Sequence, residues 1–160
     1  MKPVPPAYRW LSSLAPLPRM VQEALKLFGT VEHAGKADNP TIMAWADEVG
    51  GKVERAYYAD SVPWCGLFMA VVAKRAGKAV PQDPLWALNW AKFGRDAGQP
   101  ALGDVLVFVR NGGGHVGLYV GEDATAYHVL GGNQSDQVCI ARIAKNRLHR
   151  VRRPEYNAQP

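Results

Sequence analysis

Cysteine is scarce in this sequence, which has only Cys65 and Cys139 among 160 residues. Two cysteines are too few for a disulfide scaffold, and neither belongs to a CxxC pair or to a Cys/His cluster with the spacing of a zinc site. The four histidines include no HExxH pair, and no Asp-rich loop of the EF-hand type is present. We therefore expect no metal and no other cofactor.

Long apolar runs are also missing. The longest run without a charged residue extends from 61 to 73, and at about 1.5 Å per residue it is too short to cross a bilayer of about 30 Å. The first 28 residues contain five prolines and no clean apolar stretch after Lys2, which argues against a secretory signal peptide. We therefore expect a protein that is made in the cytoplasm and does not bind a membrane.

Acidic residues are absent from the segment 141–153, which contains six lysines and arginines. The rest of the chain is close to neutral, although the net charge of the whole chain is +5. The segment has no Phe, Tyr or Trp on which a base could stack, so we expect no nucleic-acid binding. It is either a solvated strand or tail, or a surface for another anionic partner.

The first half of the chain has apolar residues at helical spacing, with prolines and glycines where helices begin and end. The third of the predicted helices is apolar on all sides, as in a buried central helix. In the fourth, Trp86 and Trp90 stand four residues apart and are expected in the core. The helices are expected over residues 19–28, 40–49, 65–76 and 84–93.

From Gly103 onward, short β-rich runs alternate with turns rich in Gly and Asn. Helices followed by such an antiparallel meander indicate an α+β fold in one domain, residues 18–154. Residues 1–17 are expected to be a Pro-rich extension, and residues 155–160 a C-terminal tail. The strands are expected over residues 104–110, 115–120, 125–130, 137–143 and 148–153.

Cys65 stands at the start of the predicted central helix. On an apolar helix a lone cysteine is usually a small buried hydrophobe. At a helix N-terminus, however, unpaired backbone N–H groups and the helix dipole stabilise a thiolate, and a nearby imidazolium lowers the thiol pKa further. Cys65 is therefore a candidate nucleophile, whereas Cys139 lies inside a predicted strand and is expected to pack there.

His115 is the candidate base. It opens a predicted strand after three glycines, which leave room for a substrate backbone, although a lone histidine in this place is more often structural. A cysteine nucleophile needs a base within hydrogen-bond reach and a third polar group that orients the imidazole. Depending on where the next hairpin turns, Asn133 or His128 lies opposite His115. We favour Asn133, because its side-chain carbonyl can accept a hydrogen bond from the imidazole and fix its tautomer.

Four stretches of the sequence resemble a known family: PWCGLF, LGDVLVF, GGHVGLYVGED and YHVLGGNQSDQV. In this order they resemble the papain-like cysteine peptidases of the bacterial cell wall, which include NlpC-type and CHAP-type domains (cysteine, histidine-dependent amidohydrolases/peptidases). From GTVEHAGKADNPTIMAWA to the basic end, the chain is similar to a compact family of such hydrolases common in phages and prophages. The resemblance covers about residues 18–154. It implies a papain-like fold, with the nucleophile at a helix N-terminus packed on an antiparallel sheet.

The resemblance also implies roles for individual residues. Cys65 matches the nucleophile, and His115 matches the general base. The orienting residue is often a histidine on the next strand in NlpC-type domains, which matches His128, and a Glu or Asn further along in CHAP-type domains, which matches Asn133. The chain departs from the NlpC pattern, since Trp64-Cys65-Gly66 replaces the usual Asp-Cys-Ser.

The implied activity is hydrolysis of amide bonds in the stem peptide of peptidoglycan, as an endopeptidase or an N-acetylmuramoyl-L-alanine amidase. The expected protein is a monomeric phage lysin that acts on the bacterial cell wall. It is expected to reach the wall by release through a holin, as part of a virion or by injection. Anionic wall polymers are a further expected partner, through Arg150, Arg152 and Arg153. Calcium, which some CHAP-type domains bind, is not expected, since only Asp60 lies near the cysteine. Two alternatives stay open: a non-catalytic wall-binding or phage structural module of the same fold, and a Cys-His acyltransferase.

Overall fold

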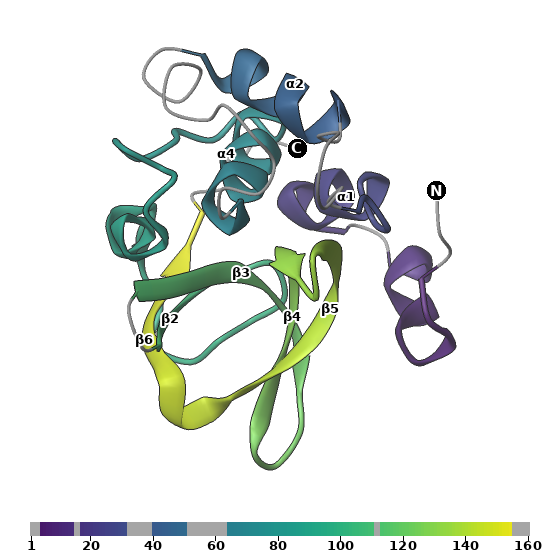
Figure 1. Ribbon diagram of the computed structural model, residues 1–160. Coiled ribbons are helices and arrows are strands. Elements are labelled where there is room, and N and C mark those ends of the chain that lie inside the picture. Colours follow the sequence, from purple (N-terminus) through teal and green to yellow (C-terminus); the bar gives the residue numbers. More distant parts are fainter. Residues whose placement is uncertain (1–3, 15–16, 32–39, 51–63, 111–112, 155–160) are drawn as a thin grey trace, which may run out of the picture.

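The computed structural model describes residues 4–14, 17–31, 40–50, 64–110 and 113–154. Helices gather on one side of a strongly curved antiparallel sheet (Figure 1). The helical half of the chain precedes the sheet, as the sequence predicted. The molecule is therefore of the α+β class.

Three α-helices of the described chain lie where the apolar spacing predicted them. They are α1 (Arg19–Lys26), α2 (Pro40–Val49) and α4 (Cys65–Arg75). Helix α4 is the central one: every residue from Cys65 to Ala73 is buried, and both α1 and α2 pack against it. No helix in the described part of the chain is long and apolar enough to cross a membrane.

The N-terminal segment packs against the rest of the fold. It forms a 3-10 helix, η1 (Pro6–Ser13), whose Leu11 is fully buried in the same core cluster as helix α4. The hydroxyl of Tyr8 lies 3.2 Å from Nδ1 of His128 on the sheet. Residues 1–17, expected as an extension, thus contribute a core residue.

The segment expected as a fourth α-helix is instead a turn followed by a short 3-10 helix, η2 (Ala87–Lys92). The turn is pressed against helix α4, where a Cβ atom at Gly66 would lie 2.1 Å from the carbonyl oxygen of Pro84. The same oxygen accepts a hydrogen bond of 2.9 Å from the indole N–H of Trp90. Trp90 is buried as predicted, but Trp86 is 71% exposed, so its predicted place in the core is wrong.

Six strands of the described chain form one sheet, in the spatial order β1-β6-β2-β3-β4-β5, with all neighbours antiparallel. Strands β2 to β5 form the predicted meander. Strand β6 departs from it, because after the 3-10 helix η3 (Lys145–Arg147) it returns to pair with β2 rather than with β5. The strands are β1 (Arg95–Asp96), β2 (Val105–Arg110), β3 (Gly113–Glu122), β4 (Ala126–Gln134), β5 (Gln137–Ala144) and β6 (Leu148–Arg153).

The two faces of the sheet carry separate apolar clusters, because successive side chains of a strand alternate between faces. On β2, Val105 and Val107 belong to the cluster that includes the helices, whereas Leu106 and Phe108 belong to the cluster on the other face. Val116 of β3 also packs with the helices. Neighbouring residues of one strand therefore lie in different surroundings.

Candidate functional site

Cys65 is the first residue of helix α4, so its thiol lies where backbone N–H groups are unpaired within the helix. The residue is buried, with 3% of its surface exposed. Burial raises the pKa of the Cys65 thiol, and this effect exceeds the opposing effects of a hydrogen bond from the N–H of Val116 and of the positive charge of Arg110. The resting group is therefore a neutral thiol. Desolvation thus outweighs the stabilisation of a thiolate that was expected from the helix N-terminus.

His115 lies near the start of strand β3, opposite Phe108 of strand β2, and is 5% exposed. Its Nε2 lies 2.9 Å from Oε1 of Gln134, whereas Nδ1 is buried and has no hydrogen-bond partner among the described residues. Burial lowers the pKa of His115 to about 4, against the opposing effect of the hydrogen bond to Gln134. The imidazole is therefore neutral near pH 7.

The side chain of Gln134 determines which imidazole nitrogen carries the proton. Its amide nitrogen donates to the carbonyl oxygens of Val129, at 3.0 Å, and Cys139, at 2.7 Å, so its oxygen must face His115. An amide oxygen only accepts hydrogen bonds, so Nε2 of the imidazole carries the proton. Nδ1 then has a lone pair that can accept a proton. This is the tautomer that a general base at Nδ1 requires.

The hydrogen-bond partner of His115 is neither of the two residues named from the sequence. It is Gln134, one position after Asn133, and a bulge in strand β4 accounts for the difference. The pairing of β4 with β5 shifts by one residue between Gly131 and Gln134, and Asn133 lies in the bulge with a left-handed φ of +57°. The sequence prediction ended this strand at residue 130, whereas β4 continues to Gln134 and its bulge adds the one residue by which the prediction differs. The side-chain carbonyl that it required is present, but Gln134 supplies it.

His128, the alternative third residue, belongs to a different cluster. Its Nε2 lies 2.8 Å from Oδ2 of Asp123, and its Nδ1 faces the hydroxyl of Tyr8. Asp123 also accepts two hydrogen bonds from Arg142, which hold the pKa of its carboxyl well below the usual range. These contacts join the N-terminal segment to strands β4 and β5, and none of them involves His115.

Cys65 and His115 are linked through the backbone of strand β3, and they form no hydrogen bond with each other among the described residues. The thiol accepts a hydrogen bond from the N–H of Val116, the residue after His115, so it lies against the strand that carries the imidazole. Val116 packs with the helices, whereas His115 faces Phe108, whose ring centre is 6.4 Å from that of the imidazole. The thiol and the imidazole therefore approach the same short stretch of β3 from different sides.

Two glycines of strand β4 allow the helix and the strands to come close at this point. A Cβ atom at Gly132 would lie 2.6 Å from Cβ of Phe68 and 2.8 Å from the ring of Trp64. A Cβ atom at Gly131 would lie 2.7 Å from Oε1 of Gln134. The absence of side chains at Gly131 and Gly132 thus makes room for the start of helix α4 and for the amide that binds the imidazole.

A cavity of about 210 Å³ lies beside the imidazole, and His115, Gln134 and Asn133 are among the residues that line it. Asn133 is therefore close to the candidate base, although it does not bond to it. The remaining lining residues come from strands β2 and β5, from the turn between β4 and β5, and from η3. They are Phe108, Val109, Arg110, Ser135, Ala141, Ile143 and Arg147.

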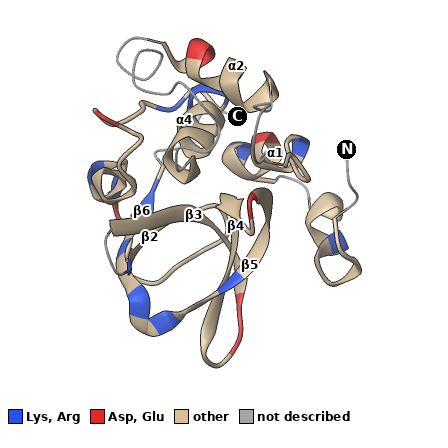
Figure 2. Ribbon diagram, in the orientation of Figure 1, with Lys and Arg blue, Asp and Glu red and all other residues tan. Residues whose placement is uncertain are grey.

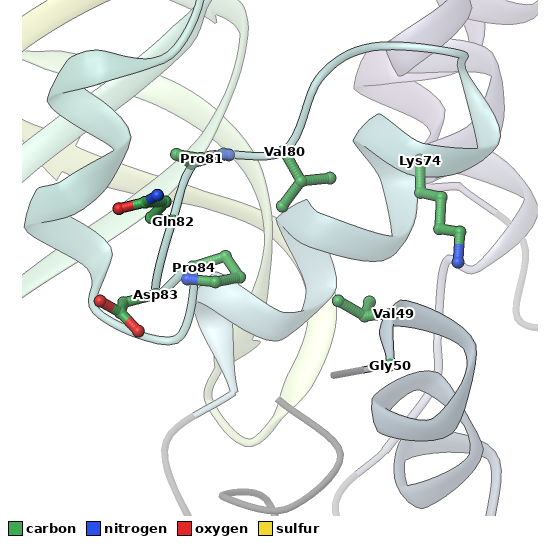
Figure 3. A pocket seen from close by; sticks show the side chains of 8 residues that line it. All are labelled: Val49, Gly50, Lys74, Val80, Pro81, Gln82, Asp83 and Pro84. Atoms are coloured by element: carbon green, nitrogen blue, oxygen red, sulfur yellow. The ribbon is translucent and has the colours of Figure 1, made fainter. Parts of the chain in front are cut away.

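A second cavity, of about 470 Å³, lies between the end of helix α2, helix α4 and the segment 80–84. Figure 3 shows the side chains of Val49, Val80 and Pro84 around this space. The described residues that line it include no cysteine and no histidine. It holds none of the candidate catalytic residues.

Two of the three arginines expected to meet anionic wall polymers are engaged within the fold. Arg152 donates to two backbone carbonyls in the segment after η2, and Arg153 makes two hydrogen bonds of 2.8 Å to the buried carboxylate of Asp104. Arg150 is exposed. Figure 2 shows that positive charge gathers where strand β5 passes into β6.

In the part of the chain that the structure describes, no three His, Cys, Asp or Glu side chains are grouped so that they could hold a metal ion. Comparison of the sequence with protein-family models gives no match, and comparison with curated proteins gives none either. The interpretation of the site therefore depends on its own geometry.

Proposed function

We propose that this chain is a cysteine-dependent amide hydrolase of the papain-like kind, with Cys65 as the nucleophile, His115 as the general base and Gln134 as the residue that orients the imidazole. One observation carries the proposal. The hydrogen bond to Gln134 leaves Nδ1 of His115 buried, unprotonated and without a partner among the described residues, on the same strand whose backbone contacts the thiol. Buried polar atoms with a purely structural role are normally hydrogen-bonded.

The reaction begins from a neutral thiol and a neutral imidazole. Nδ1 of His115 takes the thiol proton as Sγ of Cys65 attacks the amide carbonyl, and negative charge moves to the carbonyl oxygen. Backbone N–H groups at the start of helix α4 are candidates to donate to that oxygen. The step requires Sγ and Nδ1 to come within hydrogen-bond distance when substrate binds, a contact that is absent among the described residues of the unliganded structure.

The second half of the reaction returns the proton. The imidazolium gives it to the leaving amine, the C–N bond breaks, and an acyl thioester remains on Cys65. Water, losing a proton to Nδ1, then attacks the thioester, the C–S bond breaks, and the sulfur regains the proton. Water is the only co-reactant, and the products are a carboxylic acid and an amine.

The proposed substrate is the stem peptide of peptidoglycan, with the bacterial cell wall as the place of action and a phage lysin as the kind of protein. The support for this substrate is the resemblance of the stretches around Cys65, His115 and Gln134 to NlpC-type and CHAP-type domains. Arg150 supports a further contact with anionic wall polymers, because it is exposed and forms no ion pair among the described residues.

Digestion of purified peptidoglycan, followed by mass spectrometry of the fragments, tests the proposal. The wild-type protein should create new amino and carboxyl termini, and their position distinguishes an endopeptidase from an amidase. Cys65→Ala should abolish the cleavage, and iodoacetamide should inactivate the wild type. Cys139→Ser is the matched control: it keeps a donor for the backbone carbonyl of Gln134 and should retain activity.

Full activity of the Cys65→Ala protein would exclude the proposed mechanism. Binding to walls without any new termini would indicate a non-catalytic module. Products in which the acyl group is joined to a second amine, rather than to water, would identify an acyltransferase.

A further inference from the structure

Two arginines without an ion-pair partner among the described residues lie beside the candidate base. Arg110, at the end of strand β2, and Arg147, in η3, both line the cavity of about 210 Å³ that also contains His115. Neither forms an ion pair among the described residues, and none of the described residues that line the cavity is acidic. We propose that Arg110 and Arg147 form a binding subsite for a carboxylate group of the substrate.

The two arginines differ from most other cations near the C-terminal end of the sheet. Those cations are paired with carboxylates of the fold, so their charge is already neutralised where they lie. Arg110 and Arg147 are exposed and face a cavity instead, so their charge is available to a ligand. The paired groups are Arg142 with Asp123, Lys145 with Glu122, Arg152 with Asp96 and Arg153 with Asp104.

The rest of the cavity also suits a polar ligand. Asn133, Gln134 and Ser135 line it together with the arginines. Asn133 and Ser135 both have a left-handed backbone, with φ of +57° and +51°. Asp136 has a left-handed φ of +60° as well, and Ser135 and Asp136 form the two-residue hairpin loop between the paired residues Gln134 and Gln137, which requires this conformation. The hairpin thus fixes the position of Ser135 at the cavity.

A carboxylate matches this cavity in charge and in shape. Guanidinium groups bind carboxylates through pairs of parallel N–H donors, which gives direction as well as charge. The cavity is smaller than the roughly 300–1,000 Å³ of sites that enclose a whole ligand, so it suits one carboxylate-bearing residue of a longer substrate. A carboxylate held there would place a neighbouring amide bond next to His115. Only this catalytic consequence rests on the proposed function.

The test is an NMR titration of the full-length Cys65→Ala protein with N-acetyl-alanyl-alanine and, separately, with its C-terminal amide. The side-chain amide signals of Gln134 report on binding in the cavity. The free acid should bind saturably, and the amide at least about tenfold more weakly, because hydrogen bonds between charged groups are the strong ones. Arg110→Gln and Arg147→Gln should each weaken binding of the acid about tenfold. Arg9→Gln, at an exposed arginine of η1 that does not line the cavity, is the matched control and should leave binding unchanged.

Equal binding of the acid and the amide would overturn the proposal, and so would wild-type affinity in both cavity variants or a lack of saturable binding of the acid. Both arginines are exposed, so their glutamine variants should fold, and the dispersion of the same spectra verifies this. The titration measures binding and not turnover, and the Cys65→Ala protein lacks the proposed nucleophile, so the binding result is independent of hydrolysis. The subsite and the proposed activity can therefore fail separately.

Discussion

Gln134 acts on His115 through geometry rather than through charge. Its amide nitrogen donates to two backbone carbonyls, which holds its oxygen against Nε2 of the imidazole. A neutral imidazole has two tautomers, and only the one protonated at Nε2 leaves Nδ1 as a base. Without the amide, the imidazole would remain in place but would spend much of its time in the wrong tautomer or orientation.

Gln134→Ala should therefore lower kcat by about 10- to 10³-fold with little change in KM, because the loss lies in the alignment of the base rather than in substrate binding. Steady-state kinetics with a soluble muropeptide measures this. Asn133→Ala and His128→Ala are the matched controls, and we expect both to be mild, since neither residue bonds to His115. The height or the limbs of the pH–rate profile should change in the Gln134 variant and not in the controls.

Other outcomes would assign the orienting role differently. A severe effect of His128→Ala with a tolerated Gln134→Ala would indicate the arrangement of NlpC-type domains, and a severe effect of Asn133→Ala that of CHAP-type domains. If all three variants keep full activity, Cys65 and His115 work as a pair without a third residue.

Burial of His115 should also make the stability of the fold depend on pH. Its pKa falls from an ordinary 6.5 to about 4. Between these values the unfolded chain binds a proton that the folded chain does not. The contribution of His115 to the free energy of unfolding is therefore fully present above pH 6.5. It is lost as the pH falls to about 4, and the loss is about 3 kcal/mol in all. Urea unfolding across this range should show the decline in the wild type and a smaller decline in His115→Gln. Equal declines would assign the effect to other groups.

For individual residues, the sequence predicted the kind of chemical group better than the position of its side chain in the fold. The settings of Cys65 and His115 could be predicted, because a helix start and a glycine-rich strand entry are visible in the residues themselves. The partner of His115 could not, because a single left-handed residue, Asn133, shifts the register by one. The pKa of Cys65 was also misjudged, since burial depends on neighbours that the local sequence does not contain.

At the scale of elements, the site depends on how helix α4 meets strand β4. The start of the helix presents Trp64 and Phe68 to the backbone of Gly132, at a distance that leaves no room for a side chain. The position of the thiol is therefore coupled to the shape of the bulge. A small change at the bulge should move the helix start as well as weaken the packing.

Gly132→Ala should destabilise the fold by about 1–3 kcal/mol, because its Cβ would meet Cβ of Phe68 at 2.6 Å and the Trp64 ring at 2.8 Å. Activity should fall further than the loss of folded protein explains, since Cys65 moves with the helix start. Gly113→Ala is the matched control: a Cβ there meets nothing within 4 Å, so its effect should stay within about 0.5 kcal/mol. Urea unfolding and kinetics on both variants provide the comparison. Equal stabilities of the two variants would refute the proposed coupling between the bulge at Gly132 and the start of helix α4.

Local patterns predicted most of the elements, and packing decided the exceptions. Helices α1, α2 and α4 follow apolar spacing that the residues carry themselves. The segment 84–93 has a proline start and helical spacing, but the close approach of its turn to Gly66 gives a 3-10 helix instead. The return of β6 to β2 is a long-range pairing that no local pattern encodes.

At the scale of the whole molecule, the N-terminal segment shows why a boundary drawn from composition can divide a core. Its prolines suggested an extension, yet Leu11 is fully buried with the helices. Tyr8 reaches His128, and through it the ion pair of Asp123 with Arg142. The described part of the segment therefore joins the helical layer to the outer strands of the sheet.

If Leu11 is a core residue, Leu11→Ala should cost about 3 kcal/mol, because truncation of a buried leucine removes its apolar contacts and leaves a cavity. Leu14→Ala, in the same segment but 39% exposed, should cost less than about 1 kcal/mol. Urea unfolding monitored at the buried Trp45, Trp64 and Trp90 compares the two variants in a single transition. Equal and small effects would mean that the segment is an appendage, as its composition suggested. A large effect confined to Leu11→Ala would show that the N-terminal segment belongs to the cooperative unit that positions Cys65.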